Sequence, residues 1–171
     1  MRLFVAAWPP ADVVAGLARA DRPASKLVRW TTPDQWHVTL RFLGEVEDGS
    51  AITDRLAEAH LGPPVTARLG PTSVILGSSV VCLPVTGLDS LAANVIAATA
   101  DVGRPPDRRR FHGHVTLARA RGGAGRGALR HLPALCLDAS WTVDRVAVVA
   151  STLGGEGSRY QAVGTVALSG S

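Results

Sequence analysis

The sequence of 171 residues has only two cysteines, one lysine and one methionine, and charged residues make up only 19% of it. Cys82 and Cys136 lie far apart and form no C-x-x-C pair, which argues against a disulfide framework or a zinc ribbon. We expect both to be free, buried thiols in a reducing compartment. No apolar run approaches the roughly 20 residues that a membrane-spanning helix needs, and Pro9-Pro10 ends the first run too early for a signal peptide. The sequence therefore predicts a cytoplasmic protein with no membrane partner.

The composition fits a globular enzyme or binding protein. Apolar residues make up 46% of the chain, which is enough for a single domain over residues 1–171 without disulfides or a structural metal. The net charge is +4, and Lys26 is the only lysine, so the positive charge comes almost entirely from arginine. One guanidinium group can donate two parallel hydrogen bonds to the oxygens of a phosphate, so the arginine excess favours a phosphate-bearing partner. GC-rich coding gives a similar composition, so the composition alone does not establish a phosphate-bearing partner, and the site residues must show whether there is one.

The hydrophobic pattern alternates between strands and helices. Period-2 or continuous apolar runs predict strands at about 2–8, 36–43, 65–69, 73–84, 112–119, 142–150 and 159–168. Helical spacing predicts helices at about 10–20, 49–60 and 88–101, the second of them capped by Asp48 or Ser50. This order indicates an α+β fold.

An internal repeat organises the chain. Shifting the sequence by 77 residues places His37-Val-Thr-Leu on His114-Val-Thr-Leu, and it also aligns the strand and helix that precede each motif. Each half therefore contains a strand, a helix, a linker and a His-x-Thr strand. We expect a bilobal structure in which two such halves face each other about a pseudo-twofold axis.

The two motifs present the same pair of side chains. Alternate residues of a strand share a face, so His37 and Thr39 point to one side while Val38 points to the other. The same holds for His114 and Thr116. Two imidazoles with unperturbed pKa values near 6.5 can deprotonate a water and protonate a leaving oxygen without a metal or other cofactor, while the threonine hydroxyls hold phosphate oxygens. The sequence therefore predicts phosphodiester chemistry between the two halves.

An arginine beside the histidines would neutralise developing negative charge. Arg119 follows the second motif, but its odd offset from His114 aims it at the opposite face unless the strand ends or bulges there. Arg41 lies four residues after His37, and this even offset places both side chains on the same face of a regular strand. Phe42 occupies the repeat position of Arg119, so it could offer an aromatic face to a base, although a core position is the more ordinary interpretation.

These motifs resemble those of the two-histidine phosphoesterase superfamily, and specifically its RNA 2′,3′-cyclic phosphodiesterase branch, also called 2′-5′ RNA ligases. The resemblance covers almost the whole chain, including residues 36–45, 114–119, 151–153 and 157–160. It implies two antiparallel sheets flanked by helices, with both motifs lining a central groove.

The resemblance also implies an activity. His37 would donate a proton to the leaving oxygen, and His114 would activate water. Thr39, Thr116 and Arg119 would bind the phosphate, and the product would be a 2′-phosphomonoester. The partner would be RNA with 2′,3′-cyclic phosphate ends, either single-stranded or tRNA fragments, bound by a monomer. The family can also join RNA ends through a 2′-5′ linkage without ATP.

Several other features suggest further substrate contacts, a loop or a metal site. Arg109 and Arg110 belong to a basic run that could contact an RNA backbone or simply be solvated, and Tyr160 is a further possible substrate contact. The glycine-rich segment 122–127 suggests a mobile loop at the groove edge. His112-x-His114 could suggest a metal site, but no third ligand recurs at matching spacing, so we expect none.

Two other functions remain open on sequence alone. The same histidines could act on a small cyclic nucleotide such as ADP-ribose 1″,2″-cyclic phosphate, or on 2′-5′ oligoadenylate. A noncatalytic module that binds RNA ends could also keep this fold, although intact histidines and threonines argue against it.

Overall fold

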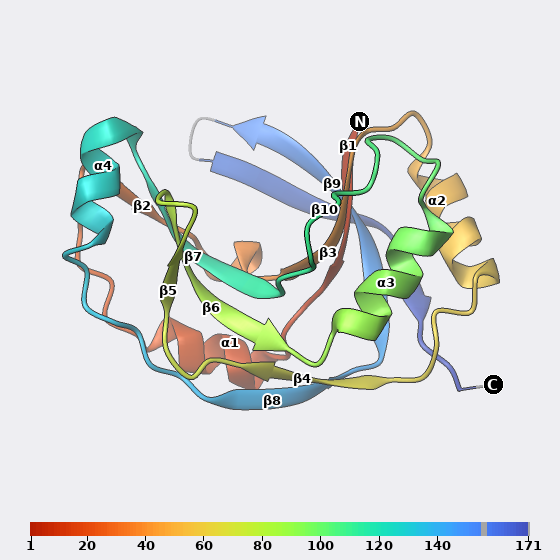
Figure 1. Cartoon of the computed structure of the whole chain (residues 1–171), viewed down its shortest axis with the longest axis horizontal. Coiled ribbons are helices and arrows are strands. Elements are labelled where there is room, and N and C mark those ends of the chain that lie inside the picture. Colours follow the sequence, from red (N-terminus) through yellow and green to blue (C-terminus); the bar gives the residue numbers. More distant parts are fainter. Residues whose placement is uncertain (155–156, 171) are drawn as a thin grey trace.

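The computed structural model describes residues 1–154 and 157–170 of the chain, which form an α+β structure (Figure 1). The helices are α1 (Ala11–Ala18), α2 (Gly49–Glu58), α3 (Asp89–Ala98) and α4 (Gly122–Leu129), with a 3-10 turn η1 (Pro33–Gln35). The strands are β1 (Arg2–Ala7), β2 (Val28–Trp30), β3 (Val38–Glu45), β4 (Val65–Leu69), β5 (Val74–Leu76), β6 (Val80–Thr86), β7 (His114–Ala120), β8 (Ala139–Val143), β9 (Arg145–Gly154) and β10 (Gly157–Ala167).

The strand order shows the predicted duplication. The main path runs β10-β9-β1-β3-β7-β6-β4-β8, so the two His-x-Thr strands, β3 and β7, lie in the middle with three strands beyond each of them. The short strands β2 and β5 pair with β7 and β6. Neighbouring strands are antiparallel throughout the described pairs. The bilobal α+β architecture predicted from the repeat is confirmed, and the two antiparallel sheets meet edge to edge.

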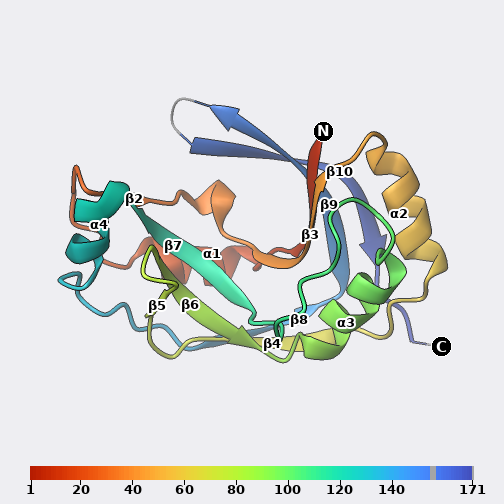
Figure 2. The same ribbon diagram turned by 45° about the horizontal axis from the view of Figure 1, so that its top comes forward.

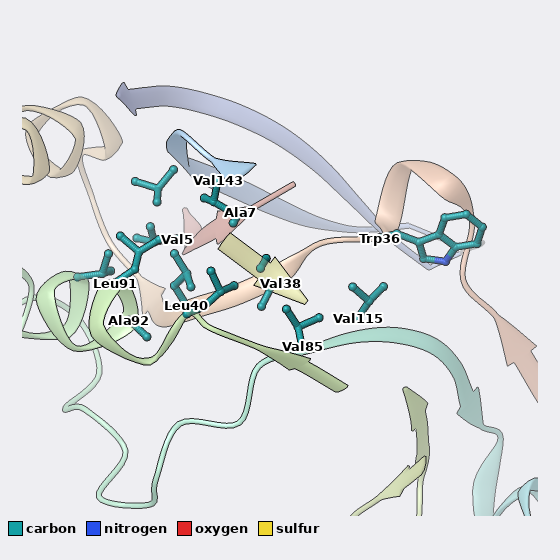
Figure 3. Packing of buried hydrophobic residues seen from close by; sticks show 14 of the residues in the cluster. Val5, Ala7, Trp36, Val38, Leu40, Val85, Leu91, Ala92, Val115 and Val143 are labelled. Carbon is teal, nitrogen blue, oxygen red and sulfur yellow. The ribbon is translucent and has the colours of Figure 1, made fainter. Parts of the chain in front are cut away.

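The halves are joined at one pair of equivalent residues. Val38 of β3 pairs with Val115 of β7, and these valines are 77 positions apart, as the repeat requires. Antiparallel pairing of equivalent residues has twofold symmetry, so the pseudo-twofold axis passes through this pair. Both valines are fully buried and point into a core that both halves share (Figure 3).

A β-bulge interrupts each His-x-Thr strand at the same repeat position. The register of β3 against β1 shifts by one residue at Leu40, and that of β7 against β6 shifts at Leu117. Because a bulge adds one residue, the side chains beyond it change face. Phe42 therefore shares a face with Thr39, and Arg119 shares one with Thr116. The bulge in β7 resolves the odd offset of Arg119 that the sequence left open.

Helices cover the outer parts of the sheet. Asp48 caps α2 as predicted, since its carboxylate accepts hydrogen bonds from the backbone N–H groups of Ser50 at 2.8 Å and Ala51 at 3.3 Å. Helix α2 packs against β9 and β10, and α3 packs against β3. Hairpin β9–β10 projects beyond the rest of the sheet in both views (Figures 1 and 2). In the described residues, no helix is long and apolar enough to cross a membrane.

Several expectations from the sequence are wrong. The strand expected at about 142–150 is two strands, β8 and β9, which lie in opposite parts of the strand order. The glycine-rich segment 122–127 is not a loop but most of helix α4, which packs against β2 and β7 through Leu129. Tertiary packing overrides the low helix propensity of glycine here. The strand expected over 73–84 is a hairpin, β5–β6, with a turn at Gly77-Ser78. Cys136 is exposed, while Cys82 is buried as expected.

The helical assignment of 122–129 predicts opposite effects for two glycine substitutions. At Gly127 an added Cβ meets nothing within 4 Å, so Gly127→Ala should raise the free energy of unfolding by about 0.5–1 kcal/mol. At Gly125 the Cβ would lie 2.4 Å from the Leu27 carbonyl oxygen, so Gly125→Ala should lower it by about 1–3 kcal/mol. Denaturant unfolding measures both, and a mobile loop would leave both values unchanged.

Candidate active site

A cavity of about 390 Å³ lies on the face of the sheet opposite the shared core, at the join between β3 and β7. Its floor is formed by His37, Thr39, His114 and Thr116. These four side chains lie together because the valine between each histidine and threonine points into the core on the other side of the sheet. The structure thus brings together the four residues that the repeated motif singled out.

Both imidazoles are oriented by the same local hydrogen bond. Nδ1 of His37 lies 2.8 Å from the carbonyl oxygen of Gln35, and Nδ1 of His114 lies 2.8 Å from that of His112. A carbonyl oxygen can only accept, so Nδ1 carries the proton in each ring and Nε2 is the nitrogen left for chemistry. In His37, Nε2 lies 3.1 Å from the Thr39 hydroxyl, which donates to it when the ring is neutral.

His37 is enclosed by aromatic rings. Phe4 stacks on it with centroids 4.8 Å apart, while Trp8 and Tyr160 approach it at 5.1 Å and 5.0 Å. Burial is the main reason that the pKa of His37 falls to about 4. The hydrogen bond to Gln35 opposes this shift, whereas the charges of His114 and Arg119 add to it. His37 is therefore neutral at pH 7 when the cavity is empty.

The structure separates the other candidate residues into two groups. Arg119, Phe42 and Tyr160 line the cavity with the histidines. Arg41, which has the right parity in a regular strand, is turned away by the bulge at Leu40. Its guanidinium is buried and donates to the carbonyl oxygens of Phe42, at 3.0 Å, and Arg104. Arg41 therefore ties β3 to the segment after α3 rather than facing a substrate.

The basic run before β7 also lies away from the cavity. Arg109 is exposed and pairs with Asp107 at 2.6 Å, and Arg110 approaches Asp89 at 4.0 Å. Neither arginine lines the cavity. Their charges are partly balanced by neighbouring carboxylates, which fits a solvated surface loop.

Several lining residues were missed from the sequence. Arg2 and Phe4 share one face of β1, and their alternation could have indicated this once β1 was paired with β3. Arg29 lies on the three-residue strand β2, which gave no sequence signal. Leu153 and Ser158 come from hairpin β9–β10, whose place above the cavity depends on tertiary structure.

A buried threonine links the two motifs from behind. The indole N–H of Trp36 donates to the Thr31 hydroxyl at 2.9 Å. That hydroxyl lies 2.7 Å from the carbonyl oxygen of Thr116 and 2.9 Å from that of Leu117, and donates between them. Thr31 thus connects the residue next to His37 with the bulge of β7, which fixes the spacing between the two histidines.

The described residues contain no group of three or more His, Cys, Asp or Glu side chains placed to hold a metal ion. His112 and His114 therefore belong to no such group.

Comparisons with known proteins agree with this geometry. Residues 8–155 match the sequence profile of the 2′-5′ RNA ligase superfamily. The chain belongs to this superfamily. Among solved structures, Escherichia coli LigT without ligand is 29% identical, with a TM-score of 0.76 and coverage of 98% of this chain and 97% of that one. A protein described as a phosphoesterase is 28% identical over 98% of both chains, with a TM-score of 0.81.

A third solved structure, TT0787 of Thermus thermophilus, is 26% identical over 99% of both chains, with a TM-score of 0.79. A comparison with curated proteins found no match. Since the superfamily likeness spans β3 and β7 together, the family resemblance seen in the two His-x-Thr motifs is confirmed.

The burial of His37 predicts that the free energy of unfolding depends on pH. The pKa of His37 is lowered to about 4, so the unfolded chain binds more protons than the folded one between pH 4 and 6.5. Stability should therefore rise with pH across that window, by at most about 3 kcal/mol from this group, and level off above it. Unfolding of His37→Gln compared with the unaltered protein measures the contribution. Equal pH dependence in both would contradict the lowered pKa.

Proposed function

We propose that this protein hydrolyses the 2′,3′-cyclic phosphate ends of RNA to 2′-phosphomonoesters by acid–base catalysis with His37 and His114. The observation that carries the proposal is the pairing of Val38 with Val115, which sets two oriented imidazoles and two threonine hydroxyls on the floor of one cavity. Such an arrangement suits a phosphorus atom that is attacked from one side and loses an oxygen on the other.

The reaction balances with these two histidines alone. His114 Nε2 takes a proton from a water whose oxygen forms a bond to phosphorus. The bond from phosphorus to the 3′ oxygen breaks, and His37 Nε2 gives that oxygen a proton. Thr39 and Thr116 hold the nonbridging oxygens, and the Arg119 guanidinium offsets the charge that builds up on them. The same displacement with a ribose 5′ hydroxyl in place of water forms a bond from that oxygen to phosphorus, breaks the bond to the 3′ oxygen and gives ATP-independent 2′-5′ ligation.

The proton-donor role of His37 depends on the substrate. A neutral imidazole with its proton on Nδ1 has no proton on Nε2 to give. The negative charge of a bound phosphodiester favours the imidazolium, as do the faces of the surrounding aromatic rings. Substrate binding is therefore coupled to proton uptake by His37, and the Thr39 hydroxyl is released from Nε2 to bind phosphate.

Nucleotide binding is supported by a structural relative. Escherichia coli LigT has been solved with 3′-AMP, with phosphate, with ATP and with NADP+, and these structures are 27–28% identical to this chain. The cavity here also offers Phe42 and the exposed Leu153 as apolar contacts for a base. Because one chain supplies the whole cavity, we propose that a monomer acts on RNA ends in the cytoplasm.

The reaction class is tested with an RNA ending in a 2′,3′-cyclic phosphate, incubated with protein in the presence of EDTA. We expect a 2′-phosphate product, resolved from the 3′-phosphate by chromatography. Loss of activity in EDTA would contradict a two-histidine mechanism. Turnover of ADP-ribose 1″,2″-cyclic phosphate or 2′-5′ oligoadenylate in the absence of RNA turnover would reassign the substrate.

Substitution of the histidines should show that they act as one unit. His37→Ala and His114→Ala should each lower kcat by several orders of magnitude, and the double variant should lose little more. His131→Ala, outside the cavity, is the matched control. Strictly additive losses would contradict a coupled acid and base, and full retention of biological function by the double variant would indicate a noncatalytic binder.

The proton uptake of His37 can be followed by NMR. On addition of adenosine 2′-phosphate, the pKa of His37 should rise from about 4 toward neutrality. If the pKa of His37 stays near 4 in the complex, the proposed assignment is reversed: His37 is then the base and His114 the acid.

A further inference from the structure

We propose that Arg29 binds the phosphate on the 5′ side of the terminal nucleotide, so that the enzyme selects cyclic phosphate ends that carry this second phosphate over nucleoside 2′,3′-cyclic phosphates that lack it. This inference rests on the proposed function and assigns a substrate class to the same cavity.

Arg29 lies directly beside Arg119 in the wall of the cavity. The two residues are register partners in the antiparallel pair of β2 and β7, so their side chains lie on the same face. Both line the cavity that contains the histidines. Like charges directly opposite each other destabilise a sheet, and they are tolerated where an anion lies between or beside them.

In the part of the chain that the structure describes, residues 1–154 and 157–170, neither Arg29 nor Arg119 takes part in an ion pair. The exposed Arg109 and Arg145, in contrast, each pair with an aspartate. Among the described residues, Arg29 and Arg119 therefore have no carboxylate partner that competes with an anionic ligand.

The two guanidinium groups come from neighbouring strands beside the reacting centre. Arg119 is three residues beyond Thr116 on β7, and Arg29 lies across from it on β2, which pairs with the edge of β7 that also pairs with β3. The charge of Arg119 reaches His37 and lowers its pKa. We therefore assign Arg119 to the reacting phosphate, which leaves Arg29, across from it on β2, for the second phosphate of the terminal nucleotide.

Arg29 is held in position between two elements. A Cβ added at Gly157, which has a φ of +119°, would lie 2.1 Å from Nη1 of Arg29 and 3.5 Å from Nε2 of Gln35. Gln35 also donates to the Ser158 carbonyl oxygen at 2.6 Å, joining η1 to hairpin β9–β10. The guanidinium therefore lies against the start of β10, close to the Gln35 side chain.

The test compares adenosine 2′,3′-cyclic phosphate with the same compound carrying a 5′-phosphate. We expect a kcat/KM for the 5′-phosphorylated substrate about 10–100-fold higher, as a charge-assisted contact supplies. Arg29→Gln should remove most of this preference through KM, while Arg29→Lys should restore part of it because only the charge is kept. Arg126→Gln, the same change of charge on exposed α4 outside the cavity, should keep the full preference.

Each outcome decides the proposal. A similar loss on both substrates in Arg29→Gln would place Arg29 on the reacting phosphate and overturn it, as would an unaltered enzyme without preference. If neither compound is hydrolysed, the proposed function fails separately. In that case, binding of adenosine 2′,5′-bisphosphate against adenosine 2′-phosphate by calorimetry still tests Arg29: a bisphosphate advantage that Arg29→Gln abolishes supports it, and equal affinities overturn it.

Discussion

The pairing of Val38 with Val115 is the contact on which the site depends. It is the point where two repeated halves meet, and it is antiparallel between equivalent residues, so each backbone position beside it in one half has its equivalent on the other side. The buried valines fix the register, since a slip by one residue would turn both histidines into the core. Fold stability and catalytic geometry therefore share the same two residues, which explains why the motif alternates an apolar with a polar residue so strictly.

The bulges at Leu40 and Leu117 add a second constraint on the same strands. Each bulge lets one more side chain reach the cavity beyond the threonine, and this side chain is Phe42 in one half and Arg119 in the other. The two bulges lie at equivalent positions of the repeat, but the side chains that they bring to the cavity differ in chemistry. One half thus offers an aromatic surface, while the other offers positive charge to phosphate.

The sequence was sufficient where a local pattern repeated. The duplicated motif predicted the α+β lobes, the shared groove and its four polar residues, because strand alternation alone decides those faces. It was insufficient where a contact between distant segments decides the outcome. The even offset of Arg41 from His37 predicted that its side chain faces the cavity, but the bulge at Leu40 turns this side chain toward the carbonyl oxygen of Arg104. Glycine composition indicated a loop at 122–127, yet packing on β7 makes it helical. Arg29 has no pattern of its own and becomes visible only when β2 pairs with β7.

The proposed reaction needs one acid and one base from a symmetric fold, and the surroundings of the two histidines differ. Phe4 and Trp8, which enclose His37, are replaced at the equivalent repeat positions by Val81 and Val85, so His114 has no such cover. Burial lowers the pKa of His37 in the empty cavity, and a bound anion opposes that effect. Two imidazoles in different environments are a general route to distinct proton-transfer roles at one pH. Duplication thus accounts for the positions of the two histidines, and divergence at Phe4 and Trp8 accounts for the difference in their surroundings.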